Sequence, residues 1–136
     1  MGVGSLIGPL VLAYATVFPR LLPLVTPKVL IASFGLAVVN AVGEEVLWRG
    51  AFLQSSRARG GPAALWPVVG FALWHYAPLS VHPNRRPGGN HAFVGVSLLL
   101  GLLWSRLSNS SYSIRWTSLT HVLFDFAGLG ALAYRR

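Results

Sequence analysis

Hydrophobic residues dominate five long stretches of the chain, and polar or turn-forming residues separate them. A helix needs about 20 mostly apolar residues to cross roughly 30 Å of hydrocarbon, and all five stretches approach or exceed that length. Prolines interrupt the first stretch, and the second is longer than one crossing, so it is expected to tilt or protrude. The pattern predicts an all-α, polytopic transmembrane bundle of about four to five helices, with stretches at about 4–24, 28–56, 63–80, 91–107 and 115–134.

The connections between these stretches are rich in Gly, Pro, Ser and Asn, which favour turns. They lie at 55–62, 80–90 and 108–114. No internal repeat and no low-complexity tract is visible. We therefore expect residues 1–136 to form a single domain.

The composition supports lipid as the outer solvent. The chain is 54% hydrophobic and only 10% charged, whereas soluble domains carry about 25% charged residues. Its formal net charge is +8, from 11 Lys+Arg against 3 Asp+Glu. Most cations lie where apolar stretches end, as expected for residues that flank membrane spans and meet anionic lipid. They form no basic patch interleaved with aromatic residues, so we expect an integral membrane protein with the lipid bilayer as its partner, and no nucleic acid partner.

The three acidic residues Glu44, Glu45 and Asp125 all lie inside predicted spans. A charged side chain at the bilayer centre costs at least ~2.5–3.5 kcal/mol, and such residues usually mark a functional site. Glu45 and Arg49 are four residues apart, so they share a helical face and can pair. Glu44 points about 100° away and would stay available for proton transfer. The alternative is that both glutamates only hold helices together through polar contacts.

Two histidines on separate stretches complete the candidate site. Phe71 and His75 are four residues apart, as are His121 and Asp125. Histidine is the side chain best suited to proton transfer near neutral pH. The alternatives are a hydrogen-bonded core histidine at His75, and an Asp125 that only orients His121. Because His121 follows Arg115 by about 6 residues, or roughly 9 Å of helix, we expect it to be the shallowest of these groups and to line the entrance.

The ordered set Glu44-Glu45-x-x-x-Arg49, Phe71-x-x-x-His75 and His121-x-x-x-Asp125 resembles the signature of the CPBP family, also called the Abi or CAAX-protease family. The match covers about residues 30–130. The resemblance implies a helical membrane protein with a glutamate-dependent endopeptidase site. Glu44 and His75 would activate a water, His121 and Asp125 would stabilise the oxyanion, and Glu45, Arg49 and Phe71 would support them.

The family includes the Ras-converting CAAX prenyl endopeptidase and many bacterial membrane proteins. Because this chain is shorter than the prenyl-protein proteases, we expect a bacterial relative in the plasma membrane that cleaves a peptide or a membrane-protein substrate. No cofactor is expected.

Three other interpretations stay open. A zinc-dependent protease could use Glu44, His75, His121 and Asp125 as ligands, because zinc takes histidine and carboxylate. A non-catalytic membrane binding or immunity protein would not need Glu44 for its function. A proton or ion pathway would use the same buried acids and histidines as a relay.

Overall fold

The structure is a computed structural model that describes residues 4–57, 65–85 and 87–134. These residues are almost entirely helical and contain no strand, so the predicted all-α class is confirmed. The elements in chain order are α1 (Gly4–Thr16), α2 (Phe18–Leu21), η1 (Leu22–Leu24), α3 (Pro27–Glu45), the π-helical segment η2 (Val46–Leu53), α4 (Gln54–Arg57), α5 (Trp66–Trp74), α6 (Tyr76–Val81), α7 (Gly89–Ser111), α8 (Arg115–Ala127) and η4 (Gly130–Tyr134).

Local sequence signals set where the long helices begin and end. Thr26 caps α3, because its hydroxyl accepts a hydrogen bond from the Val29 N–H at 3.3 Å, and Pro27 occupies the first turn, where no amide donor is needed. Gly88 precedes α7 with φ 81°, and a Cβ there would lie 2.5 Å from the Ala92 Cβ, so only glycine fits. Tyr112 ends α7 in the left-handed conformation.

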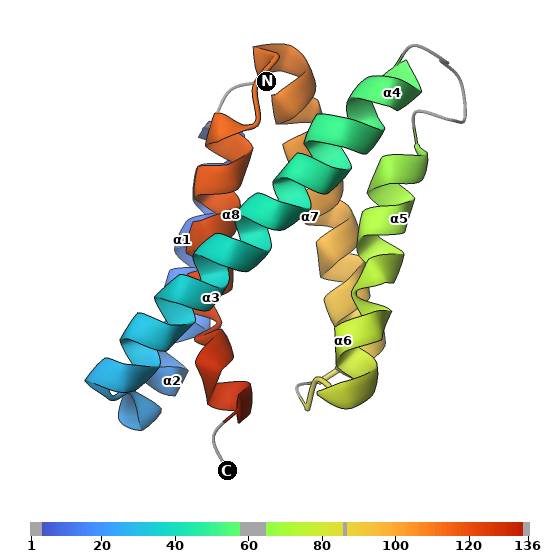
Figure 1. Cartoon of the computed structure of the whole chain (residues 1–136). Coiled ribbons are helices and arrows are strands. Elements are labelled where there is room, and N and C mark those ends of the chain that lie inside the picture. Colours follow the sequence, from blue (N-terminus) through green and yellow to red (C-terminus); the bar gives the residue numbers. More distant parts are fainter. Residues whose placement is uncertain (1–3, 58–64, 86, 135–136) are drawn as a thin grey trace.

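The continuous rod of α3, η2 and α4 crosses the bundle diagonally (Figure 1). Its first half packs against α8 and η4, and its η2 part packs against α5 and α7. In Figure 1, α8 and α1 lie along one side of the rod, and α5 and α6 run beside α7 on the other. The rod is therefore the element that both halves of the bundle share, and the paired glutamates lie where it passes from one half to the other.

Three helical segments are long and apolar enough to cross a membrane: Gly4–Leu24, Pro27–Ser56 and Gly89–Ser111. Large apolar side chains cover their outer faces; Ile31, Val39 and Leu99 are 75%, 76% and 63% exposed. Exposed apolar surface of this extent is stable in lipid and costly in water. The chain is an integral membrane protein with a helical bundle fold. We also expected spans at about 63–80 and 115–134. The described helices in these two regions, α5 with α6, and α8, are shorter than the predicted spans.

Candidate active site

The buried base of the site is an ion pair between Glu45 at the end of α3 and Arg49 in η2. Arg49 Nη1 donates to Glu45 Oε1 at 2.9 Å, and the two side chains are 1% and 0% exposed. The pair expected from the four-residue spacing is therefore present. Glu45 directly precedes the π-helical segment η2, and Arg49 lies within it. Such segments often occur at functional sites.

The guanidinium of Arg49 lies close to two aromatic rings. Its central carbon lies 4.1 Å from the centre of the Phe71 ring and 5.5 Å from that of Trp104. Arg49 Nη2 also lies 3.5 Å from the Gly101 carbonyl oxygen. A Cβ on Gly101 would lie 2.9 Å from Phe71 Cδ1, so glycine lets α7 approach this cluster closely. Cation–π contacts of this kind are strongest when they are desolvated.

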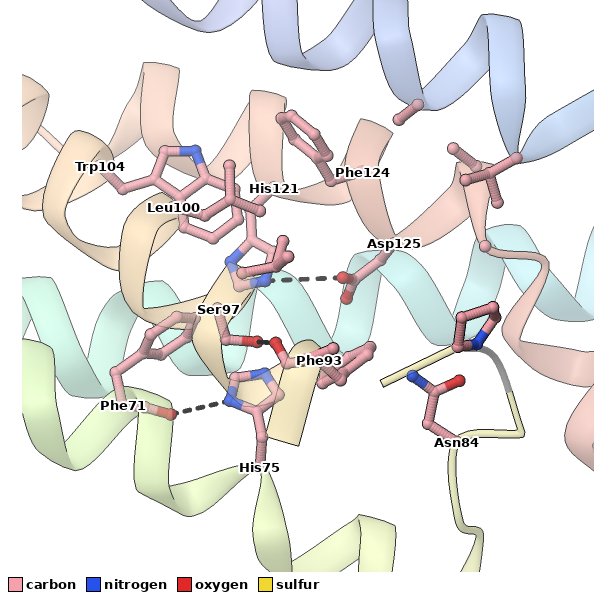
Figure 2. A pocket seen from close by; sticks show the side chains of 17 residues that line it. Phe71, His75, Asn84, Phe93, Ser97, Leu100, Trp104, His121, Phe124 and Asp125 are labelled. Carbon is pink, nitrogen blue, oxygen red and sulfur yellow. Dashed lines mark hydrogen bonds and ion pairs between the residues drawn. The ribbon is translucent and has the colours of Figure 1, made fainter. Parts of the chain in front are cut away.

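His75 is held in one ring tautomer by the backbone. Its Nδ1 lies 2.8 Å from the Phe71 carbonyl oxygen, as the dashed line in Figure 2 shows. A carbonyl oxygen only accepts, so Nδ1 carries the hydrogen and donates it. In the neutral ring the lone pair is then on Nε2, which lies 4.0 Å from Glu44 Oε2. The Phe71-x-x-x-His75 spacing thus turns the basic nitrogen toward Glu44.

His121 joins all three acidic side chains. Its Nδ1 lies 3.0 Å from Glu45 Oε1, and its Nε2 lies 3.7 Å from Glu44 Oε2. The same Nε2 lies 3.6 Å from Asp125 Oδ1, a contact that Figure 2 shows. The Trp104 ring stacks on the imidazole with ring centres 4.1 Å apart. The hydrogen bond to Glu45 and the stacked indole together fix both the position and the plane of the ring.

The prediction that His121 lines the entrance was wrong. Its side chain is 3% exposed, less than those of Glu44 (10%) and Asp125 (29%). Counting residues along a helix gives a height in the membrane, but it does not reveal which neighbours cover a side chain. Trp104 covers His121, so Asp125 is the more open member of the pair.

Glu44 is the carboxylate that Arg49 does not pair with. Its Oε2 is buried and has no hydrogen-bond partner among the described residues. That oxygen lies near the Nε2 atoms of both His75 and His121, at 4.0 and 3.7 Å. These separations are too long for direct hydrogen bonds and suit groups that share one small polar molecule.

Asn40 is a site neighbour that the sequence analysis missed. Its Nδ2 donates to Asp125 Oδ2 at 3.0 Å, while Asp125 Oδ1 faces His121. Asn40 precedes Glu44 by one helical turn and lies near the middle of the Pro27–Ser56 span. An amide at mid-span between apolar neighbours in the sequence was the available signal, since polar side chains are costly at that depth.

A cavity of about 370 Å³ opens beside these groups. Its polar lining consists of His75, Asn84, Ser97, His121 and Asp125, and apolar side chains, mainly from α1, α5, α7 and α8, form the rest (Figure 2). This volume is at the small end of the range for ligand pockets. A mostly apolar cavity with a few convergent polar groups suits a short apolar stretch of polypeptide. The other lining residues include Ala13, Val17, Phe93, Val96, Leu100 and Phe124.

The zinc interpretation gains no direct support from the geometry. Across the parts of the chain that the structure describes, no group of three or more His, Asp or Glu side chains is arranged to hold a metal ion. The residues proposed as zinc ligands instead make the contacts given above.

Comparison with protein-family models gives a match over most of the chain. A family model described as Rce1-like, type II CAAX prenyl endopeptidase Rce1-like, matches residues 26–127, which are 102 of the 136 residues. This range contains Asn40 and all seven residues of the three motifs. No curated protein and no solved structure gave a match.

Proposed function

Since the chain belongs to the Rce1-like family of type II CAAX prenyl endopeptidases and is thus a CAAX-type intramembrane endopeptidase, we propose that Glu44 and His75 activate the water that cleaves its substrate. The substrate is a peptide or membrane protein whose cleaved bond enters the cavity beside His75. We further propose the plasma membrane of a bacterium as its location.

The position of Glu44 is the observation that carries this proposal. Its Oε2 lies 4.0 Å from His75 Nε2, and both atoms are free of other hydrogen bonds among the described residues. A water that donates a hydrogen bond to each of these two atoms would point its hydrogens at the two bases. An oxygen lone pair of the water would then be free to attack a carbonyl carbon. General bases act through such contacts of about 2.6–3.2 Å.

The reaction begins when this water attacks the carbonyl carbon of the peptide bond. Glu44, assisted by His75, takes the proton of the water as the new C–O bond forms. Negative charge then develops on the carbonyl oxygen. His121 donates to it from Nε2 in the imidazolium form, in which Nδ1 also donates to Glu45 Oε1. Donors fixed in place before the reaction stabilise such charge most effectively, and Glu45 and Trp104 fix His121. The C–N bond breaks when the same proton passes to the leaving amine.

The test is proteolysis by the purified chain in liposomes, with a peptide library and ¹⁸O-labelled water. Hydrolysis places one ¹⁸O atom in the new carboxyl group, which mass spectrometry detects. We expect labelled products from the wild-type chain and none from Glu44→Ala. Identical products from both proteins would contradict the proposal and would favour a non-catalytic binding or immunity protein.

Asn40 is proposed as a positioning residue that acts through Asp125. Its amide holds Oδ2, which leaves Oδ1 directed at His121 Nε2. A hydrogen bond to a charged group contributes about 1.5–3 kcal/mol. If all of this free energy is lost from the stabilisation of the transition state, Asn40→Leu is expected to lower kcat by about 10- to 100-fold. The matched control is Val39→Leu, at the neighbouring exposed position of α3, which should keep the wild-type rate.

A double-mutant cycle separates this role from simple helix packing. If Asn40 acts through Asp125, then Asn40→Leu should cost nothing further in an Asp125→Ala background. Equal losses in both backgrounds would refute the positioning role. Because Asp125 is the only aspartate in the sequence, ¹³C-labelled aspartate gives one carboxyl NMR signal, which should shift in Asn40→Leu and not in Val39→Leu.

Chelation tests the zinc alternative. We expect the wild-type chain to keep its full cleavage rate after dialysis against a strong chelator, because Glu44 and His75 supply the proton transfer themselves. The metal content of the dialysed protein is measured in the same sample. A loss of activity that added zinc restores would instead assign Glu44, His75, His121 and Asp125 as ligands.

A further inference from the structure

Arg106 is a cation inside a candidate membrane span. It lies in the Gly89–Ser111 segment, five residues before its end, which is about 7.5 Å along the helix axis. Its side chain is exposed, and no acidic side chain pairs with it in the described parts of the chain. A charge at this depth needs a partner or a path to the interface.

The chain itself has no acid left to pair with Arg106. Its three acidic residues are Glu44, Glu45 and Asp125, and all three lie in the candidate active site. A second copy of the chain has the same limitation, because its acids would lie in its own site. An anion that pairs with Arg106 would therefore not be an acidic side chain of this protein.

A groove of about 380 Å³ runs along α7 beside Arg106. Pro9 of α1 lines it, together with apolar residues of α7 from Val96 to Leu103. Val96, Leu99 and Leu103 are spaced so that they lie on one helical face. Apart from Arg106, every residue that lines this groove is apolar.

The length of the groove matches one leaflet of a bilayer. Arg106 and Val96 are ten residues apart, which corresponds to about 15 Å of helix. Half of the hydrocarbon core is also about 15 Å thick. A phosphate that meets the Arg106 side chain at the membrane surface, near Ser111, would thus place the end of an acyl chain near Leu100, within the groove.

We propose that this groove binds an anionic phospholipid, with its phosphate on Arg106 and one acyl chain along α7. Charge complementarity selects the anionic headgroup, and the apolar lining selects the acyl chain. Val96 and Leu100 line both this groove and the cavity of the candidate active site. The end of the acyl chain then lies one side chain away from that cavity and supports its wall. This proposal does not depend on the cleavage chemistry.

The test is native mass spectrometry of the full chain in an equal mixture of phosphatidylglycerol and phosphatidylcholine. The wild-type chain should retain phosphatidylglycerol preferentially. Arg106→Gln should reduce that preference about fivefold, the contribution expected of one cation near anionic lipid. Arg20→Gln removes the same charge from an exposed residue of α2 outside the groove and should leave the preference unchanged.

A second variant tests the acyl-chain part of the site. Leu99→Trp adds volume to the groove at a position that is 63% exposed, so the fold should tolerate it. It should lower retention of both lipids. Equal retention of the two lipids by the wild-type chain, or equal effects of Arg106→Gln and Arg20→Gln, would overturn the proposal. A dimer that only Arg106→Gln dissociates would also overturn it and would assign the groove to a second copy.

Discussion

Replacing Glu44 with glutamine is expected to lower the rate of peptide cleavage by about 10²- to 10⁴-fold, the contribution of a well-placed general base. Glutamine keeps the shape of the side chain but cannot take the proton of the water. Glu44 Oε2 has no hydrogen-bond partner among the described residues, so the substitution breaks no bond at that oxygen. The measurement is the initial cleavage rate at a fixed amount of protein in liposomes, together with a thermal unfolding curve.

The adjacent glutamate supplies a matched control. Glu45 carries the same carboxylate one residue further along the helix, but its Oε1 contacts both Arg49 and His121. Glu45→Gln should therefore lower the unfolding temperature, whereas Glu44→Gln should leave it nearly unchanged. If Glu44→Gln cleaves at the wild-type rate, Glu44 is not the base. If the cleavage rate of Glu44→Gln falls only by the fraction of the protein that is unfolded, the role of Glu44 is structural.

The helical fold and the proximity of the motif residues could be predicted because the membrane leaves few choices. Acids inside apolar helices usually face the bundle interior or a cavity, so Glu44, Glu45 and Asp125 were expected to gather there. The four-residue spacing of Glu45 and Arg49 then predicted their ion pair. These arguments use only helix periodicity and the cost of charge in lipid, and both can be read directly from the order of the residues.

The finer geometry depends on contacts between helices that the sequence does not specify. The burial of His121 depends on Trp104, which lies on another helix. The link from Asn40 to Asp125 joins residues 85 positions apart. The close approach of α7 at Gly101 likewise requires knowledge of which helix faces it. Each of these features follows from how the helices pack, and periodicity within one helix cannot reveal it.

The side chains of the site range from fully buried at one end to partly exposed at the other. The ion pair of Glu45 and Arg49 is almost fully buried, while Asp125, at the other end, is 29% exposed. His121 connects the two ends, because one ring nitrogen contacts Glu45 and the other faces Glu44 and Asp125. The base of the site thus sets the orientation of the groups that would act on a substrate, which makes its integrity a condition of activity.

Replacing Arg49 with methionine is expected to destabilise the protein by about 3–5 kcal/mol, because it leaves the Glu45 carboxylate buried without its cation. Methionine retains much of the side-chain length, so the loss reports mainly on charge and on the contacts with Phe71 and Trp104. Unfolding in detergent, followed by circular dichroism, measures the effect. Arg20→Gln, which removes an exposed cation, should change stability by no more than about 0.5 kcal/mol.

The double variant Glu45→Met with Arg49→Met separates stability from activity. Removing both charges eliminates the unpaired buried carboxylate, so most of the lost stability should return. Cleavage should not return, because His121 Nδ1 has then lost the carboxylate that orients its ring. A double variant that is both stable and fully active would show that the ion pair serves folding alone. A single Arg49→Met variant as stable as the wild type would contradict the buried pair itself.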